Sequence, residues 1–329
     1  MKSCDKLVCS NVLKYITYDD MTLFNGIANK LRCFEYAKQN IYFPDGRGYI
    51  DFTELLSKME IPYEILSIDQ LRHCKDVSDI LLFAPKEILD NIEIIKNNVT
   101  GIYIVYSAFF IKKITRNSII LCIEDYKFRY EKELTFYELE NISKLSSKPL
   151  GYTFKIIRID RNKKLDKSLL LGSLKNSLAD FLEDGIELTE GIKCVKGPLF
   201  YDTMVNALSE ILYDSTEKES RIKFFIFSST LNAGGEAFYR YDFLKSILSS
   251  GIKGKNKDID YAIDTLEIVK KMWYELARIL RFAQKNNDDI NISSIVDLLN
   301  KIKKMELEAV NILLLNFDVL GGCYAVGNK

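Results

Sequence analysis

Histidine is nearly absent from this chain, which contains a single one, His73, in 329 residues. A catalytic thiol usually relies on an imidazole, so any such thiol has one candidate partner in the whole sequence. An excess of charge of either sign is also missing, because Lys plus Arg and Asp plus Glu number 46 each. Without a net positive field, binding to nucleic acid is not expected.

Long apolar runs are missing as well. No run reaches the roughly 18 residues of a membrane-spanning helix. The amino terminus, MKSCDKLVCSNVLKY, lacks the apolar core and the cleavage site of a signal peptide. We therefore expect a cytoplasmic protein with no membrane partner.

Cysteines are scattered and odd in number, which excludes a dense disulfide framework and predicts reduced thiols. Neither the spacing from Cys4 to Cys9 nor the adjacent pair His73 and Cys74 matches the closely spaced ligand pairs of a zinc site. The sequence therefore indicates no metal and no cofactor. The seven cysteines stand at positions 4, 9, 33, 74, 122, 194 and 323.

What the chain does have is apolar and aromatic residues, 47% and 12% of the total, and this content can fill one large core or two ordinary ones. Its length favours two domains. The charged segment RNKKLDK, at 161–167, is the natural linker. We therefore predict a first domain at 1–160, the linker, and a second domain at 168–329.

The first domain begins with helical periods. Apolar residues recur at three- and four-residue intervals between 10 and 40 and predict two short helices. The cluster Pro44-Asp45-Gly46 predicts an exposed loop. The segment APKEILDNIEIIKNN, at 84–98, predicts a helix with Pro85 in its first turn.

The period then changes to that of strands. β-Branched and aromatic residues between 101 and 136 predict about three strands. Helices first and a largely antiparallel sheet afterwards indicate an α+β fold. Around these strands we also expect helices at 53–59 and 136–145 and strands at 63–68 and 152–160.

In the second domain the periods are almost all helical and predict five or six helices. The segment SRIKFFIFSST, at 220–230, fits either a strand or a buried helix.

Several short motifs follow one another along the chain. CSNVLKYI, LFNGI and CFEY supply a Cys that opens a helix and then a Phe-x-Tyr. GGEAFYRYDFL supplies paired glycines followed by aromatic residues and an Arg. A Trp, a Leu and a Glu follow on long helices. The residues concerned are Cys9, Phe24, Gly26, Phe34, Tyr36, Gly234, Gly235, Phe238, Arg240, Tyr241, Phe243, Leu244, Trp273, Leu276 and Glu306.

In this order the motifs resemble the family of the butirosin biosynthesis protein H, and the resemblance covers most of the chain. It implies a papain-like amino-terminal domain, of the cysteine peptidase type, joined to a helical carboxy-terminal domain. Members of that family move an acyl group from a carrier-protein thioester to an amine. The resemblance thus implies an acyl or peptidyl carrier protein or a synthetase as partner, with a small-molecule amine as acceptor.

The resemblance also assigns roles to residues. Cys9 is the expected nucleophile, because a thiolate at a helix start attacks the thioester and forms an acyl-enzyme. Asp125 occupies the place of the acid that orients the imidazole. The interval IKKITRNSII, where that imidazole belongs, contains no His. Asn117 is the polar residue nearest to the position expected for the imidazole. His73 lies upstream, so another element would have to supply the base.

The paired glycines have two interpretations. Gly234 and Gly235, with Arg240 nearby, match a backbone nest for an anion such as the phosphate of a carrier's phosphopantetheine. They also match a plain turn between helices.

Three functions follow from these observations. The first is an accessory protein of natural-product biosynthesis, of the non-ribosomal peptide or aminoglycoside type, that resembles an acyltransferase with degenerate catalytic residues. The second is a non-catalytic binding or scaffold module for a carrier protein or synthetase, a pseudoenzyme in which Cys9 is only a small buried hydrophobe. The third is a cysteine peptidase.

Overall fold

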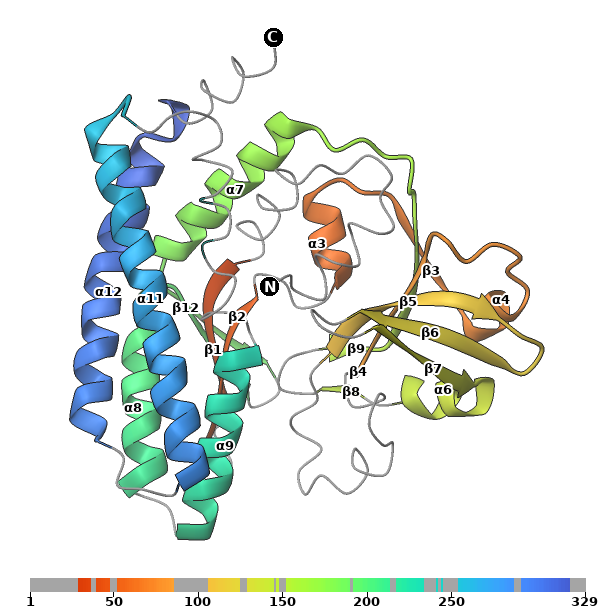
Figure 1. Ribbon diagram of the computed structural model, residues 1–329, viewed down its shortest axis with the longest axis horizontal. Helices are drawn as coiled ribbons and strands as arrows, with labels where there is room; N and C mark the ends of the chain where they lie inside the picture. Colours follow the sequence, from red (N-terminus) through yellow and green to blue (C-terminus); the bar gives the residue numbers. More distant parts are fainter. Residues whose placement is uncertain are drawn as a thin grey trace. The chain divides into compact units, whose positions relative to one another are not determined.

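A computed structural model gives the architecture of the chain (Figure 1). It describes residues 29–36, 40–47, 52–85, 106–124, 129–144, 146–147, 152–189, 192–213, 217–233, 241, 244, 254–286 and 291–319.

These residues form two compact units. Unit 1 holds the described residues from 52 to 166, and unit 2 holds 29–47 together with those from 167 onward. Both units combine helices with antiparallel sheets, so the predicted α+β class is confirmed.

Unit 1 is built on a six-stranded antiparallel sheet with the order β3-β10-β4-β5-β6-β7. All five side chains from Ile80 to Ala84 in β4 are at most 1% exposed, as expected of a central strand covered on both faces. The strands are β3 (Tyr63–Leu66), β4 (Ile80–Pro85), β5 (Tyr106–Ile114), β6 (Ser118–Glu124), β7 (Arg129–Thr135) and β10 (Lys155–Ile159), with a separate short pair, β8 (Ser146–Ser147) and β9 (Tyr152–Thr153).

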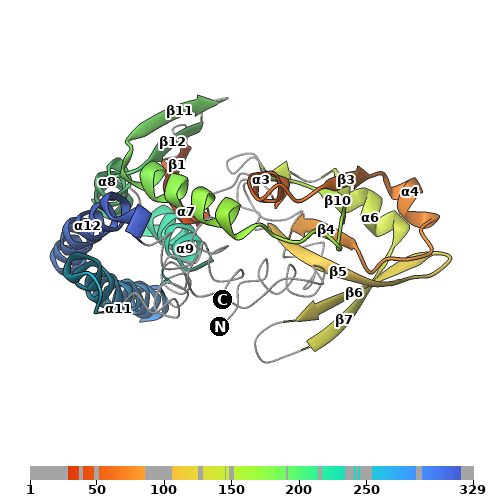
Figure 2. The same ribbon diagram turned by 90° about the horizontal axis from the view of Figure 1, so that it is seen from above.

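Three short helices accompany this sheet (Figure 2): α3 (Phe52–Lys58), α4 (Ile68–Arg72) and α6 (Phe136–Ser143). Two of them start with a reciprocal capping box. Ser67 and Gln70 cap α4, and Thr135 and Glu138 cap α6. Each box satisfies two amino-terminal N–H groups, which fixes where the chain turns from strand to helix.

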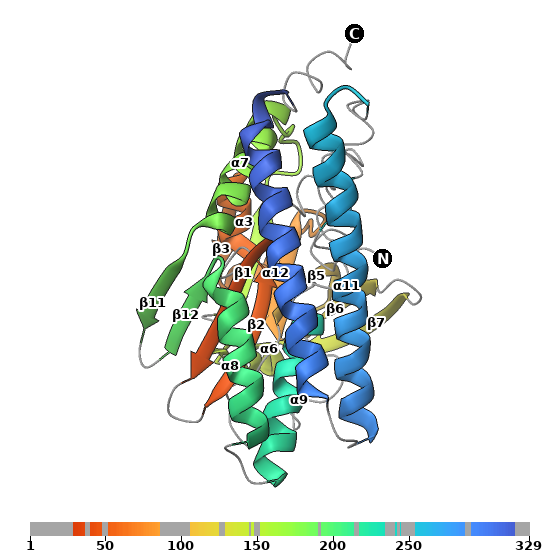
Figure 3. The same ribbon diagram turned by 90° about the vertical axis from the view of Figure 1, so that its left-hand side faces the viewer.

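Unit 2 combines a four-stranded antiparallel sheet, ordered β11-β12-β1-β2, with long helices. Helix α8 packs against this sheet, and α11 and α12 lie side by side (Figures 1 and 3). The strands are β1 (Asn29–Tyr36), β2 (Ile41–Arg47), β11 (Gly185–Thr189) and β12 (Ile192–Lys196), and the helices are α7 (Lys167–Leu182), α8 (Leu199–Tyr213), α9 (Glu217–Ala233), α11 (Lys257–Asn286) and α12 (Ile292–Leu315). Among the described residues, no helix has both the length and the apolar character needed to cross a membrane.

The helices predicted between 10 and 40 are wrong where the structure describes that segment, because residues 29–36 form β1. The loop predicted at Pro44-Asp45-Gly46 is wrong too, because these residues lie within β2. Strand β2 is at the edge of its sheet, where a proline without an N–H removes no ladder bond between two strands. Strand pairing decided the conformation of both segments, since β1 pairs with the distant β12 and β2 pairs with β1.

Of the other sequence predictions, some are wrong and some are confirmed. Pro85 is the last residue of β4 and not the start of a helix, and the remainder of the predicted helix, 86–98, lies outside the described residues. The hairpin of β11 and β12 was not predicted within the helical second half. The ambiguous segment 220–230 is helical and belongs to α9. The strands predicted between 101 and 136 are confirmed as β5, β6 and β7 in their described parts.

The division of the chain differs from the expected one in its first part. Unit 1 gives way to unit 2 between Asp166 and Lys167, which lies inside the predicted linker 161–167. Residues 29–47, however, belong to unit 2, since β1 pairs with β12 in that unit's sheet.

Replacing Trp273 by Ala is expected to lower the free energy of unfolding by about 3–5 kcal/mol, because this side chain is fully buried in the core of unit 2 and its loss leaves a cavity. Phe282 lies on the same helix and is 61% exposed, so Phe282→Ala should cost about 0.5 kcal/mol or less. Urea unfolding followed by circular dichroism measures both. Equal losses in the two variants would contradict the packing described for α11.

Candidate functional site

Most of the predicted site residues lie outside the described part of the chain. Cys9, Asp125, Gly234, Gly235 and Arg240 all fall there. Of the residues predicted to act in catalysis or binding, His73 is the one that the structure places.

His73 is exposed and caps the carboxyl end of α4, where its backbone N–H donates to the carbonyl oxygen of Gln70 at 3.2 Å. Its imidazole has no hydrogen bond or ion pair with any side chain in the described ranges. Asn117 is also exposed and lies in the turn between β5 and β6, where its carbonyl oxygen accepts from the N–H of Phe136 at 3.0 Å.

The sheet order bears on whether His73 can reach the acid expected after β6. Cys74, next to His73, contacts Arg158 of β10, whereas β6 ends at Glu124. Two strands, β4 and β5, separate β10 from β6. Three strand spacings amount to about 14 Å. The strand that leads to Asp125 is thus well separated from the strand next to His73.

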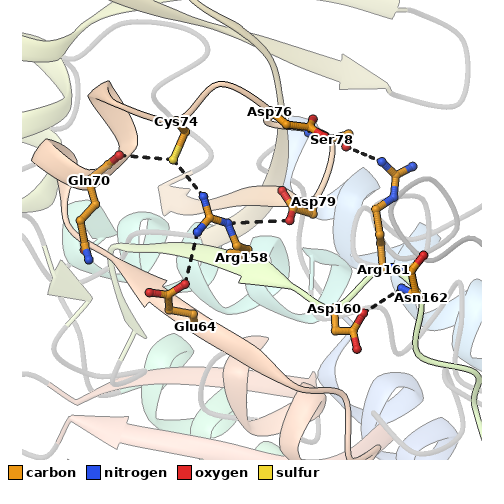
Figure 4. Close-up of polar contacts among 10 residues, drawn as sticks. All are labelled: Glu64, Gln70, Cys74, Asp76, Ser78, Asp79, Arg158, Asp160, Arg161 and Asn162. Atoms are coloured by element: carbon orange, nitrogen blue, oxygen red, sulfur yellow. Dashed lines mark hydrogen bonds and ion pairs between the residues drawn. The ribbon is translucent and has the colours of Figure 1, made fainter.

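The structure brings together a polar cluster around Arg158 (Figure 4). The guanidinium of Arg158 donates from Nη2 to the sulfur of Cys74 at 3.0 Å. Its Nη1 lies 3.3 Å from Oε2 of Glu64, and its Nε lies 3.7 Å from Oδ2 of Asp79. Glu64 and Arg158 are register partners on β3 and β10, so strand pairing itself sets this contact. The cluster joins β3, β10 and the segment between α4 and β4.

A second arginine holds the same segment beside this cluster. Arg161 donates from Nη1 to the hydroxyl of Ser78, and the backbone N–H of Ser78 donates to Oδ1 of Asp76 at 2.9 Å (Figure 4). Hydrogen bonds from the Ser78 backbone and side chain, with the charge of Arg161 as a smaller cause, lower the pKa of Asp76. These bonds fix the loop that carries His73 and Cys74.

The chemistry open to Cys74 follows from its partners. It is the one cysteine that is not buried among those in the described ranges. Its thiol donates to the carbonyl oxygen of Gln70 at 3.2 Å, and within the described contacts neither an imidazole nor a carboxylate accepts its proton. A thiol without a base nearby is not set up for nucleophilic catalysis. The Arg158 cluster therefore has a structural role, because it holds the segment between α4 and β4 against β3 and β10.

Unit 2 contains a buried polar group at the place where sequence motifs converge. Glu306 of α12 is 0% exposed and accepts a hydrogen bond from the hydroxyl of Tyr201 of α8. The ring of Tyr201 lies 6.3 Å, centroid to centroid, from that of Trp273 on α11, and Phe200 lies 5.4 Å from Tyr201. Three helices thus meet around one tyrosine. Two of the residues singled out in the sequence, Trp273 and Glu306, surround it.

Burial governs the protonation of Glu306. Removal from water disfavours the charged carboxylate and raises the pKa of Glu306 well above its usual range. The neutral carboxyl is the form that this core accommodates.

Tyr201 and Arg158 are the residues that the sequence did not reveal. Tyr201 lies on an ordinary apolar helix face, and Arg158 interrupts an apolar strand. For Arg158, the one available signal was that a charged residue interrupts an otherwise apolar strand. Comparison with protein-family models finds no match for this chain, and no curated protein sequence matches it.

We expect Glu306→Gln to remove a pH dependence of stability. Above a pH of about 4.5 the unfolded chain ionises Glu306 while the folded chain keeps it neutral, so the wild-type free energy of unfolding falls as pH rises toward the folded-state pKa. The glutamine keeps an oxygen that accepts from Tyr201 and carries no ionisable group. Urea unfolding should show that the free energy of unfolding of the variant, relative to that of the wild type, is higher at pH 8 than at pH 4.5.

Glu308→Gln is the matched control for this measurement. Glu308 lies on the same helix and also accepts from a tyrosine, Tyr261, at 3.2 Å, but it is exposed. Its variant should follow the wild-type pH profile. Parallel profiles for Glu306→Gln and the wild type would show that the buried carboxyl does not titrate as described.

Proposed function

We propose that this chain is an accessory protein of natural-product biosynthesis, of the non-ribosomal peptide or aminoglycoside type, related to acyltransferases that move an acyl group from a carrier-protein thioester to an amine. Its amino-terminal part is papain-like in this proposal, and its standard catalytic pair is degenerate. Cys9 is the residue that receives the acyl group in any activity that remains.

One observation carries the proposal. The motif residues of the second half that the structure describes are all buried: Tyr241, Leu244, Trp273, Leu276 and Glu306 are each at most 2% exposed. Residues that stand far apart in the sequence, in the order of the family pattern, are thus all core residues of unit 2. Such a set supports a common fold with that family more than separate surface matches would.

The described part of unit 1 supports degeneracy of the catalytic pair. The interval where the imidazole belongs forms the end of β5, a tight turn and the start of β6. The turn is closed by the N–H of Thr115, which donates to the carbonyl oxygen of Ser118 at 2.8 Å, and the two hydroxyls lie 2.6 Å apart. The turn contains Thr115, Arg116, Asn117 and Ser118, whose hydroxyl donates to Glu133 of β7, and it supplies no imidazole. A thiol served by this turn would react slowly.

Two alternatives remain beside this proposal. A binding or scaffold module for a carrier protein or synthetase needs no base, so the missing imidazole leaves it intact. A cysteine peptidase needs the same base as acyl transfer, and the same absence weakens it.

The test is acyl transfer to the full-length protein. We expect incubation with an acyl-loaded carrier protein to add one acyl group slowly, as seen in the intact mass, and peptide mapping should place it on Cys9. Cys9→Ala should lose the adduct because the nucleophilic sulfur is gone. Cys74→Ala is the matched control, since its thiol is the accessible one among the described cysteines, and it should keep the adduct.

Each contrary result points to one alternative. A complex with the carrier that forms equally well with Cys9→Ala, without any adduct on the wild type, indicates a binding module. Loss of labelling in His73→Ala would mean that His73 acts as the base and that the pair is intact. Turnover of a fluorogenic peptide that depends on Cys9 would indicate a peptidase.

A further inference from the structure

Arg32 occupies an unusual position in the four-stranded sheet of unit 2. It lies on β1, and its side chain is only 6% exposed. Alternation along the strand puts Arg32 on the same face as Phe34, whose register partners are Phe43 on β2 and Cys194 on β12. Phe43 is 0% exposed, and Lys196 and Glu187 lie on the same face, so this face carries both buried apolar and charged side chains.

This guanidinium is unpaired among the described residues. It makes no ion pair or hydrogen bond with a described side chain, and its buried Nε is without an acceptor. The register partner of Arg32 on β12 is Lys196, a second cation, whose ammonium group is already paired with the carboxylate of Glu187 on β11. The charges of Lys196 and Glu187 therefore cancel one another and supply no net counter-charge to Arg32.

An unbalanced buried arginine is costly, and it cannot relieve the cost by losing a proton. The guanidinium stays charged at every physiological pH, unlike a buried lysine or carboxyl group. A buried charge without a counter-charge destabilises the folded state. Its planar fork of N–H donors matches the two oxygens of a carboxylate or a phosphate.

We propose that Arg32 anchors an anion-binding site in unit 2 that takes a singly charged oxyanion, the carboxylate or the phosphodiester group of a ligand. A single negative charge is the amount that balances Arg32, since Lys196 is already paired with Glu187. This proposal goes beyond acyl transfer and does not depend on Cys9. The site is defined by residues of the four-stranded sheet alone.

The alternative counter-charge is Asp45, the register partner of Arg32 on β2. The two explanations predict opposite effects of mutation in the absence of added anion. With an external anion as the partner, Arg32→Met in chloride buffer should unfold at a temperature equal to or higher than that of the wild type, because a costly buried charge is removed. With Asp45 as the partner, Arg32→Met and Asp45→Asn should each lower the unfolding temperature, and the double variant should recover part of the loss.

The direct test is thermal unfolding of the full chain, followed by circular dichroism at constant ionic strength. About 100 mM sodium acetate or sodium dimethyl phosphate replaces part of the sodium chloride. We expect at least one of these probes to raise the wild-type unfolding temperature by about 3 °C relative to chloride. Acetate reports a carboxylate site, and dimethyl phosphate reports a phosphodiester site.

Variants tie this shift to Arg32. Arg32→Met should lose it, whereas Arg278→Met, which removes an exposed arginine of α11, should keep it. Should Arg32→Met fail to fold, Arg32→Lys retains the charge without the fork and should show less than half of the wild-type shift. An equal shift in the wild type and the Arg32 variants, no shift with either probe, or the paired losses expected for Asp45 would overturn the proposal.

Discussion

The antiparallel pairing of β1 with β12 is the interaction on which the rest of unit 2 depends. It carries an early segment of the chain into a sheet whose other half follows α7, and closing so long a loop costs entropy before any contact repays it. A second contact reinforces it: the hydroxyl of Tyr42 on β2 donates to Glu210 on α8 at 2.5 Å, across 168 residues of sequence. Burial, and then the hydrogen bond to Glu210, raise the pKa of Tyr42. The tyrosine therefore stays protonated and keeps donating.

The interior of unit 2 contains charged and polar groups, and they are stabilised in different ways. Glu306 can become neutral, and Tyr201 satisfies it with a hydrogen bond. Arg32 has neither solution among the described residues, because a guanidinium does not deprotonate and its neighbour on β12 is another cation. One buried group thus stabilises the helical core through its neutral form, and the other requires a counter-charge. Burial keeps Glu306 neutral and part of the core, whereas burial of the charged Arg32 points to a ligand that supplies the counter-charge.

Unit 1 shows the reverse situation in the Arg158 cluster, whose charged residues are partly exposed and paired. Arg158 bridges Glu64, Asp79 and Cys74, and Arg161 holds Ser78. These contacts position the loop that bears His73, but they leave its imidazole without a carboxylate partner among the described residues. The Arg158 cluster is an assembly of ionic contacts that orders a loop, and it contains no base for a thiol.

The sequence by itself determined the elements whose stability is local. Apolar periodicity located α8, α11 and α12, runs of β-branched residues located β5, β6 and β7, and the α+β class followed from their order. Trp273 is buried for the same reason, since it continues an apolar helix face. Only the tertiary structure decided that 29–36 and 41–47 are strands, because β1 pairs with β12, a partner far along the chain that no local period encodes, and β2 pairs with β1. It alone also decided which charges are paired, since Arg158 and Arg32 both look like polar interruptions of apolar strands. What separates them is the contact made across the strands, because Arg158 is paired with its register partner Glu64, whereas Arg32 lies between Lys196 of β12 and Asp45 of β2 and makes no ion pair with a described side chain.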